Sequence, residues 1–103
     1  MKMEDLKRNE VVVCADGFTM SVQAHAAAYC IPRMTGAPVY REVEVGFPNQ
    51  REELLMEWAE EAHKPTDTVY GFVPVRVVTN GIAKHGGMVS GEVPRGVIPL
   101  EGS

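Results

Sequence analysis

Residues 11–25, VVVCADGFTMSVQAH, predict a β-hairpin, and this pattern restricts the fold of the chain more than any other. At its centre lies Asp16-Gly17, a dipeptide typical of a two-residue type I′ turn, because both central positions of that turn need a positive φ angle. Strands that close on this turn place Val13 opposite Met20. The hairpin therefore predicts an antiparallel sheet near the start of the chain.

In this register the two strands have one apolar face and one mostly polar face, because side chains alternate along a strand. The residues expected on the apolar face are Val11, Val13, Ala15, Phe18, Met20 and Val22. The residues expected on the other face are Val12, Cys14, Thr19, Ser21 and Gln23. We therefore expect one face of the sheet to cover the core and the other to meet solvent or a partner.

Further strands and two helices are predicted from the rest of the chain. Short apolar segments flanked by prolines and glycines predict strands at residues 39–47, 68–73 and 88–93. Apolar residues at helical spacing predict helices at residues 50–63 and 74–85. The resulting order, β-β-β-α-β-α-β, predicts an α+β fold in which two helices pack on one face of a mainly antiparallel sheet.

The first predicted helix carries a clear start signal. Asn49 is a good N-cap, and Glu52 three residues later completes a variant of the capping box. The apolar stripe of this helix consists of Leu55, Trp58, Ala59 and Ala62. We expect Trp58 to anchor the helix to the sheet, since a buried indole covers a large apolar area.

The second predicted helix has a narrow apolar stripe of Val75, Val78 and Ile82. Gly86-Gly87 is expected to end this helix, because glycine readily adopts the left-handed conformation that closes many helices.

A length of 103 residues suits a single domain over residues 1–103 with one modest core. Within this domain, residues 1–10 are expected to be a lead-in to the first strand, and residues 94–103 a loose tail. The longest loop is expected at residues 26–38, which contain two prolines and a glycine.

Charge and composition restrict the partners and the compartment. The net charge of −4 and the scattered lysines and arginines argue against nucleic acid as a partner, because its binding needs a basic surface. Residues 1–10 lack the apolar segment of a secretory signal, so we expect a reducing cytoplasm, with Cys14 and Cys30 as free thiols. No apolar run approaches the length of a membrane span, and no membrane association is expected.

Histidines and cysteines are the candidates for catalysis or metal binding. His25, His63 and His85 have no ligand spacing with one another or with the cysteines, so no metal and no cofactor are expected. His63 and His85 lie at predicted helix ends, where the helix dipole favours an imidazolium. Cys30 and His25 could form a nucleophile and its base, but a buried thiol explains Cys30 more simply. We predict no catalytic residues, and a cysteine-dependent enzyme remains an alternative.

Aromatic and arginine side chains gather around the predicted strand ends and form the candidate binding site. Such residues are enriched at binding surfaces, although a small domain also uses them to close its core. The candidate ligand- or partner-binding residues are Tyr29, Arg33, Tyr40, Arg41, Tyr70 and Phe72.

Three segments, DGFTMSVQAHAAAYC, YREVEVGFP and TVYGFVP, resemble a family of short, uncharacterised proteins encoded in bacteriophage and prophage genomes. The resemblance covers about residues 14–90. It implies a bacterial host cytoplasm as the setting. The family has no assigned activity, so the resemblance implies no site residues.

Two classes of binding function fit these features, and neither involves catalysis. The first is a small phage-type accessory protein that occupies or inhibits a host protein, such as part of its defence or regulatory machinery. The second is the capture of a small ligand, such as a nucleotide signal, in a pocket between copies of a homo-oligomer. In that case Tyr29 and Tyr40 would stack on the ligand, and Arg33 and Arg41 would pair with its phosphates.

Overall fold

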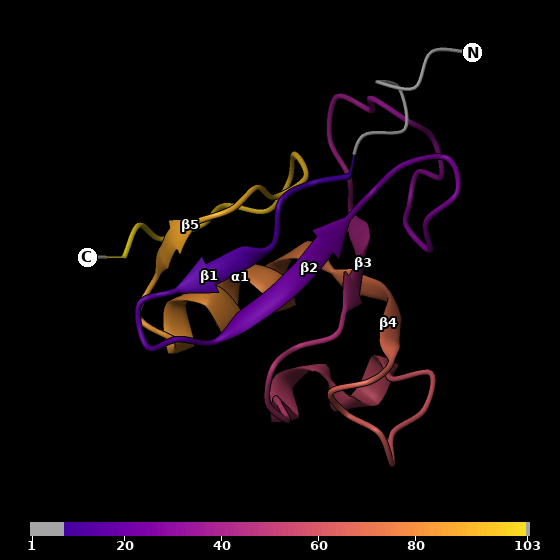
Figure 1. Ribbon diagram of the computed structural model, residues 1–103. Coiled ribbons are helices and arrows are strands. Elements are labelled where there is room, and N and C mark those ends of the chain that lie inside the picture. Colours follow the sequence, from indigo (N-terminus) through magenta and orange to yellow (C-terminus); the bar gives the residue numbers. More distant parts are fainter. Residues whose placement is uncertain (1–7, 103) are drawn as a thin grey trace.

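The computed structural model describes residues 8–102, so most of the predicted lead-in at residues 1–10 lies outside the described part. Along the described chain, strands and helices follow one another in the predicted order (Figure 1). The elements are β1 (Val12–Cys14), β2 (Thr19–Gln23), β3 (Glu42–Gly46), the 3-10 helix η2 (Glu53–Trp58), β4 (Val69–Pro74), α1 (Val75–Lys84) and β5 (Met88–Ser90). The α+β class is confirmed.

The strands form one sheet in the order β4-β3-β2-β1-β5, and every neighbouring pair is antiparallel. A tight turn joins β1 to β2, and longer connections place β3 and β4 beside them. Helix α1 then returns the chain to the opposite edge, where β5 pairs with β1. Figure 1 shows α1 behind the β1–β2 hairpin, and η2 contacts both β4 and α1.

The hairpin register differs by one residue from the prediction. Val12, not Val13, pairs with Met20. The turn is not of type I′, since Gly17 has a φ of 94° but Asp16 does not adopt a positive φ. Instead, the Gly17 N–H donates to the carbonyl oxygen of Cys14 at 2.9 Å, as in a type I turn that ends in a glycine bulge.

This shift exchanges the two faces of β1, because side chains alternate with a period of two. Val12 and Cys14, which were expected on the outer face, are buried in the core. Val11 is 48% exposed, and Val13 is only half-buried. In β2, Met20 and Val22 lie in the core as predicted, and so does Phe18 just before the strand. Gln23, which was expected on the polar face, is buried as well, at 3% exposed.

The predicted α-helix at residues 50–63 is reduced to the six-residue 3-10 helix η2. Asn49 does not cap it. Its side chain instead accepts a hydrogen bond from the Thr19 N–H at 3.0 Å and donates one to the Gly17 carbonyl at 2.9 Å. Glu52 takes the N-cap position and accepts from the Leu54 N–H. The tertiary contact with the hairpin thus removes the cap that the longer helix needed.

The 3-10 helix ends where the chain returns to the sheet. Ala59 has extended backbone angles and forms a β-bridge with Tyr70 at the outer side of β4. Leu55 is buried, Trp58 is half-buried beside the core, and Ala62 is exposed. The predicted apolar stripe therefore holds only in its first part.

Helix α1 agrees with the prediction. Val78 and Ile82 are buried, and the helix gives way to Gly86 and Gly87, whose φ angles are 90° and 96°. Gly87 also has a steric role, because a Cβ atom there would lie 2.6 Å from the backbone nitrogen of Gly102.

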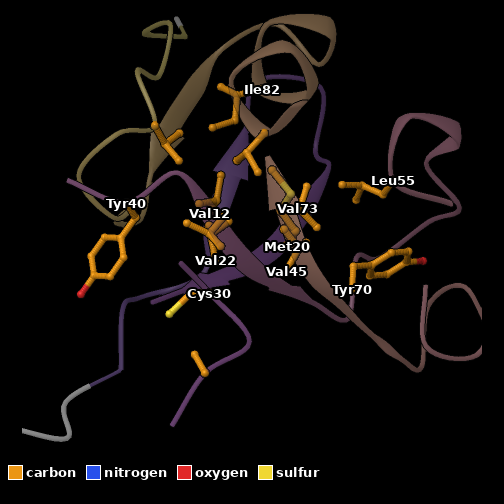
Figure 2. Packing of buried hydrophobic residues seen from close by; sticks show 14 of the residues in the cluster. Val12, Met20, Val22, Cys30, Tyr40, Val45, Leu55, Tyr70, Val73 and Ile82 are labelled. Carbon is orange, nitrogen blue, oxygen red and sulfur yellow. The ribbon is translucent and has the colours of Figure 1, made fainter. Parts of the chain in front are cut away.

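One hydrophobic core lies between the sheet and the two helices (Figure 2). Its largest fully buried side chains are Tyr70, Phe18, Met20 and Ile82. None of the described helices is long and apolar enough to cross a lipid bilayer.

The C-terminal segment 94–102 has no regular structure, but it is held against the domain and is not loose as expected. The Leu100 carbonyl accepts a hydrogen bond from the Met88 N–H at 2.7 Å. The Arg95 carbonyl accepts another from the Tyr40 N–H at 2.8 Å. Segment 94–102 therefore covers the outer edge of β5 and closes one side of the sheet.

Candidate functional site

Three of the predicted binding residues come together at the surface, and we call Tyr29, Arg33 and Phe72 the aromatic–arginine patch. The ring centroids of Tyr29 and Phe72 lie 5.8 Å apart at an interplanar angle of 34°. The Cζ atom of Arg33 lies 5.4 Å from the centroid of the Tyr29 ring. Tyr29 and Phe72 are each 40% exposed. The patch therefore presents two aromatic rings and one guanidinium to solvent.

A β-bulge in β4 sets the direction of Phe72. Val43 pairs with Val73 and Val45 with Tyr70, so Gly71 and Phe72 both stand opposite the single residue between the two valines of β3. Phe72 has a φ of 56°, in the left-handed region. For a bulky L-residue this conformation costs roughly 1–2 kcal/mol. Bulges of this kind turn a side chain away from its regular direction.

Contacts with the loop at residue 29 hold the bulge in place. The Phe72 N–H donates to the carbonyl oxygen of Tyr29 at 3.0 Å. The Tyr29 N–H in turn donates to Oε1 of Glu44 on β3 at 3.0 Å. Gly71 allows this close approach, because a Cβ atom there would lie 3.3 Å from Cβ of Tyr29. The loop and the sheet together therefore orient the patch.

Two other predicted binding residues, Tyr40 and Tyr70, belong to the core instead. Their exposed fractions are 4% and 0%. The Tyr40 hydroxyl donates to the carbonyl oxygen of Met34 at 2.7 Å, and the Tyr70 hydroxyl to that of Pro65 at 2.6 Å. Burial raises the pKa of Tyr70. Both rings close the core, so neither is available to a partner.

The remaining predicted residue, Arg41, is exposed just before β3. The backbone of Arg41 connects the loop at Ile31 to the start of α1. The Arg41 N–H donates to the carbonyl oxygen of Ile31, and the Arg41 carbonyl accepts from the N–H of Val75. Within residues 8–102, no hydrogen bond or ion pair connects the Arg41 side chain to the aromatic–arginine patch.

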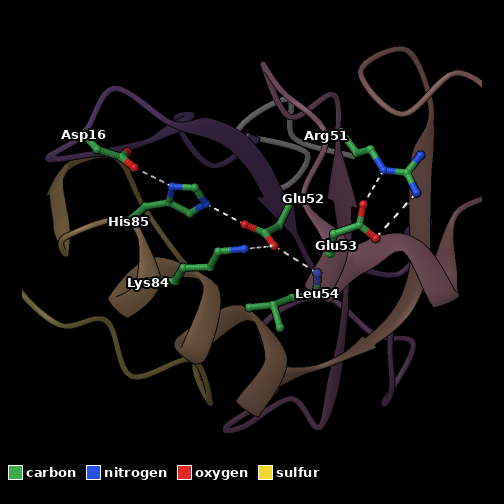
Figure 3. Close-up of polar contacts among 7 residues, drawn as sticks. All are labelled: Asp16, Arg51, Glu52, Glu53, Leu54, Lys84 and His85. Carbon is green, nitrogen blue, oxygen red and sulfur yellow. Dashed lines mark hydrogen bonds and ion pairs between the residues drawn. The ribbon is translucent and has the colours of Figure 1, made fainter.

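A second arrangement, which the sequence did not indicate as a unit, is a carboxylate–histidine cluster of Asp16, Glu52, Lys84 and His85 (Figure 3). Nδ1 of His85 lies 2.6 Å from Oδ2 of Asp16, and Nε2 lies 2.6 Å from Oε1 of Glu52. Nζ of Lys84 lies 2.7 Å from Oε2 of Glu52. The cluster joins the hairpin turn, the start of η2 and the end of α1.

The charges within the cluster compensate one another. Each ring nitrogen of His85 faces a carboxylate oxygen, and Lys84 supplies a positive charge to Glu52. Burial alone would raise the pKa of Glu52. Hydrogen bonds from Lys84, from the Leu54 N–H and from His85 outweigh burial, so the pKa of Glu52 lies below its ordinary value of 4.5.

The centre of the cluster is buried, whereas Asp16 and Lys84 are partly exposed. Glu52 and His85 are 2% and 6% exposed, and the Phe18 ring stacks on the imidazole at a centroid distance of 4.0 Å. The described residues enclose no pocket. A position for His85 at the end of α1 was predicted, but its carboxylate partners come from distant parts of the chain.

Cys30 and His25 do not form a nucleophile and its base. Sγ of Cys30 donates to the backbone carbonyl oxygens of His25 and Pro32, at 3.3 and 3.4 Å, and not to the imidazole. Burial is the main cause that raises the pKa of Cys30. A buried neutral thiol is a poor nucleophile. Among residues 8–102, no group of three or more histidine, cysteine or acidic side chains is placed to hold a metal ion.

Comparison of the chain with protein-family models, with curated proteins and with solved structures finds no match. The geometry and chemistry of the aromatic–arginine patch are therefore the basis for the proposed function.

Proposed function

We propose that the protein acts by binding another protein through the aromatic–arginine patch. The observation that supports this most directly is the grouping of two exposed rings and a guanidinium. The centroids of the Tyr29 and Phe72 rings lie 5.8 Å apart, and Cζ of Arg33 lies 5.4 Å from the Tyr29 centroid. Phe72 holds its ring there with a φ of 56°. Phe47 has a similar φ and is also exposed, but within the described residues it belongs to no such group.

The composition of the patch fits a protein partner. Tyrosine, phenylalanine and arginine are enriched in the centres of protein interfaces. The cation–π contact between Arg33 and Tyr29 and the hydrogen bond from the Phe72 N–H to the Tyr29 carbonyl orient the three side chains of the patch before binding. Such preorganisation reduces the entropy that is lost on association.

The covered sheet edges favour docking by side chains over the addition of a strand. At one edge, the N–H of Phe72 already donates to the Tyr29 carbonyl. At the other edge, Met88 exchanges backbone hydrogen bonds with Leu100 and Gly102. A strand from a partner would have to displace these contacts first.

The resemblance to phage proteins makes a bacterial host protein the partner that we propose, and occupation or inhibition of that protein the effect. The alternative of nucleotide capture would require a pocket at an interface between copies, because the described chain encloses none by itself.

The test compares two phenylalanines in similar conformations. Phe47 has a φ of 50° and is 54% exposed, and it follows the end of β3 outside the patch. Asparagine tolerates the left-handed region, so Phe72→Asn and Phe47→Asn change an exposed ring without adding strain. Each variant and the wild type are used as bait in a bacterial lysate, and bound proteins are quantified by mass spectrometry.

We expect the wild type and Phe47→Asn to retain one stoichiometric partner that Phe72→Asn loses. Recovery of no such partner by the wild type would refute the proposal. Equal recovery by Phe72→Asn would also refute it, because the partner would then bind elsewhere.

A further inference from the structure

We infer that the aromatic–arginine patch recognises an acidic peptide segment, in which a carboxylate lies next to an apolar or aromatic side chain. This inference rests on the proposed function and specifies the chemistry of the partner. It follows from the state of the Arg33 guanidinium and from the residues around it, and the charge of the whole chain argues against a nucleic acid strand as the ligand.

Arg33 has no carboxylate partner within the described residues. The ion pairs there involve Arg51, Lys84 and His85, and the Arg33 side chain donates no hydrogen bond to another described residue. Its guanidinium is positioned over the Tyr29 ring at 5.4 Å. No described acceptor takes a hydrogen bond from its N–H groups, so they remain available for a bidentate contact with a carboxylate.

Two acidic side chains lie near the patch, and neither forms an ion pair with Arg33 among the described residues. Oε1 of Glu44 accepts the Tyr29 N–H at 3.0 Å, and Glu44 is half-buried, so it positions the loop. Oε2 of Glu60 would lie 3.5 Å from a Cβ atom on Gly71, close to Tyr29. The Arg33 guanidinium is therefore left for a partner.

The apolar part of the ligand would pack on the two rings. Tyr29 and Phe72 are each 40% exposed and tilted by 34° to each other. This arrangement offers a corner between two aromatic surfaces directly beside the guanidinium. A leucine, phenylalanine or tryptophan next to an aspartate or glutamate has the matching chemistry.

The net charge favours a peptide over a nucleic acid strand as the ligand. The chain has a net charge of −4. A strand with one phosphate per nucleotide would be repelled by this charge, whereas a single carboxylate beside Arg33 needs only a local positive group.

The experiment selects ligands for the full-length protein from a surface-display library of random twelve-residue peptides. The best peptide, its version with every Asp and Glu replaced by the amide, and a single-stranded oligothymidylate are then titrated against the wild type, Phe72→Asn, Arg33→Gln and Arg76→Gln. Arg76 is an exposed arginine on α1 outside the patch, so Arg76→Gln matches the change in net charge. Thermal melts verify that each variant is folded.

We expect enrichment of Asp or Glu beside Leu, Phe or Trp. Arg33→Gln should weaken binding of the acidic peptide by about tenfold or more, as for loss of a charge-assisted hydrogen bond. It should also remove the preference for the acidic peptide over its amide version. Arg76→Gln should leave both affinities within about twofold of the wild type.

Two outcomes separate this inference from the proposed function. Peptides that require Phe72 but show no acidic preference, and bind Arg33→Gln as well as the wild type, would overturn the inference and leave the protein-binding function intact. Absence of any peptide that requires Phe72 would count against both. Tighter binding of a single-stranded oligothymidylate probe than of any peptide, with the same dependence on Phe72 and Arg33, would replace the peptide by a nucleic acid.

Discussion

Nε2 of His85 lies 2.6 Å from Oε1 of Glu52, and both side chains are almost completely shielded from water. This contact joins the end of α1 to the start of η2, and Asp16 on the opposite ring nitrogen extends it to the hairpin turn (Figure 3). Buried charges are costly unless they are paired, so each member of the cluster depends on the others.

Replacement of Glu52 by glutamine should therefore destabilise the protein strongly. Glu52→Gln leaves His85 and Lys84 without their common buried carboxylate, a loss that typically costs about 3–5 kcal/mol. The measurement is the free energy of unfolding in urea. The neighbouring Glu53 is the matched control, because its ion pair with Arg51 is exposed and Glu53→Gln should change the free energy of unfolding very little. Similar losses for the two variants would contradict the cluster.

The same cluster predicts that acid destabilises the protein. The pKa of Glu52 is lower in the folded protein than its ordinary value of 4.5. The stability that ionised Glu52 contributes is therefore complete above pH 4.5 and is lost as the pH falls through the folded pKa. Urea unfolding at a series of pH values should show a decline in stability below that point. The decline should be shallower in Glu52→Gln, and parallel curves would refute this role.

The positions of Leu55 and Trp58 reverse the order of importance that their sizes suggest. Leu55 is 2% exposed, whereas Trp58 is half-buried at the end of η2. Leu55→Ala should cost about 2–5 kcal/mol, as for a fully buried side chain. Trp58→Ala should cost less, about 1–3 kcal/mol, because part of the indole stays in contact with water. Thermal or urea unfolding compares the two, and a larger loss for Trp58→Ala would show that its ring is part of the core.

Phe72→Asn should have only a small effect on stability. Release of the left-handed strain, roughly 1–2 kcal/mol, offsets the apolar contacts that the partly exposed ring loses. We expect the free energy of unfolding to change by no more than about 1 kcal/mol. Phe18→Ala provides the contrast, because Phe18 is 2% exposed and the loss of a buried phenylalanine costs about 3–5 kcal/mol. A large loss in Phe72→Asn would mean that the ring serves packing.

Local signals in the sequence were sufficient for the order of the elements. The end of α1 at Gly86 and Gly87 depends on the intrinsic freedom of glycine, and the burial of Val78 and Ile82 follows from helical spacing. The aromatic–arginine patch was anticipated in part for a similar reason, since residue types alone indicate which side chains suit an interface. The same rule also selected Tyr40 and Tyr70, which are buried, because residue type cannot distinguish an aromatic ring at a surface from one in a core.

The sequence by itself determined the number and order of the elements, because hydrophobic spacing, glycines and prolines act over a few residues. Tertiary structure decided the hairpin register and the length of the first helix. The Asp16 N–H donates to the backbone carbonyl of His85, and the Asp16 carboxylate contacts the His85 ring. The Asn49 side chain accepts a hydrogen bond from Thr19 in the hairpin. Glu52 and His85 are separated by 33 residues. Their pairing depends on how the elements pack, and no pattern within a short window of sequence contains that information.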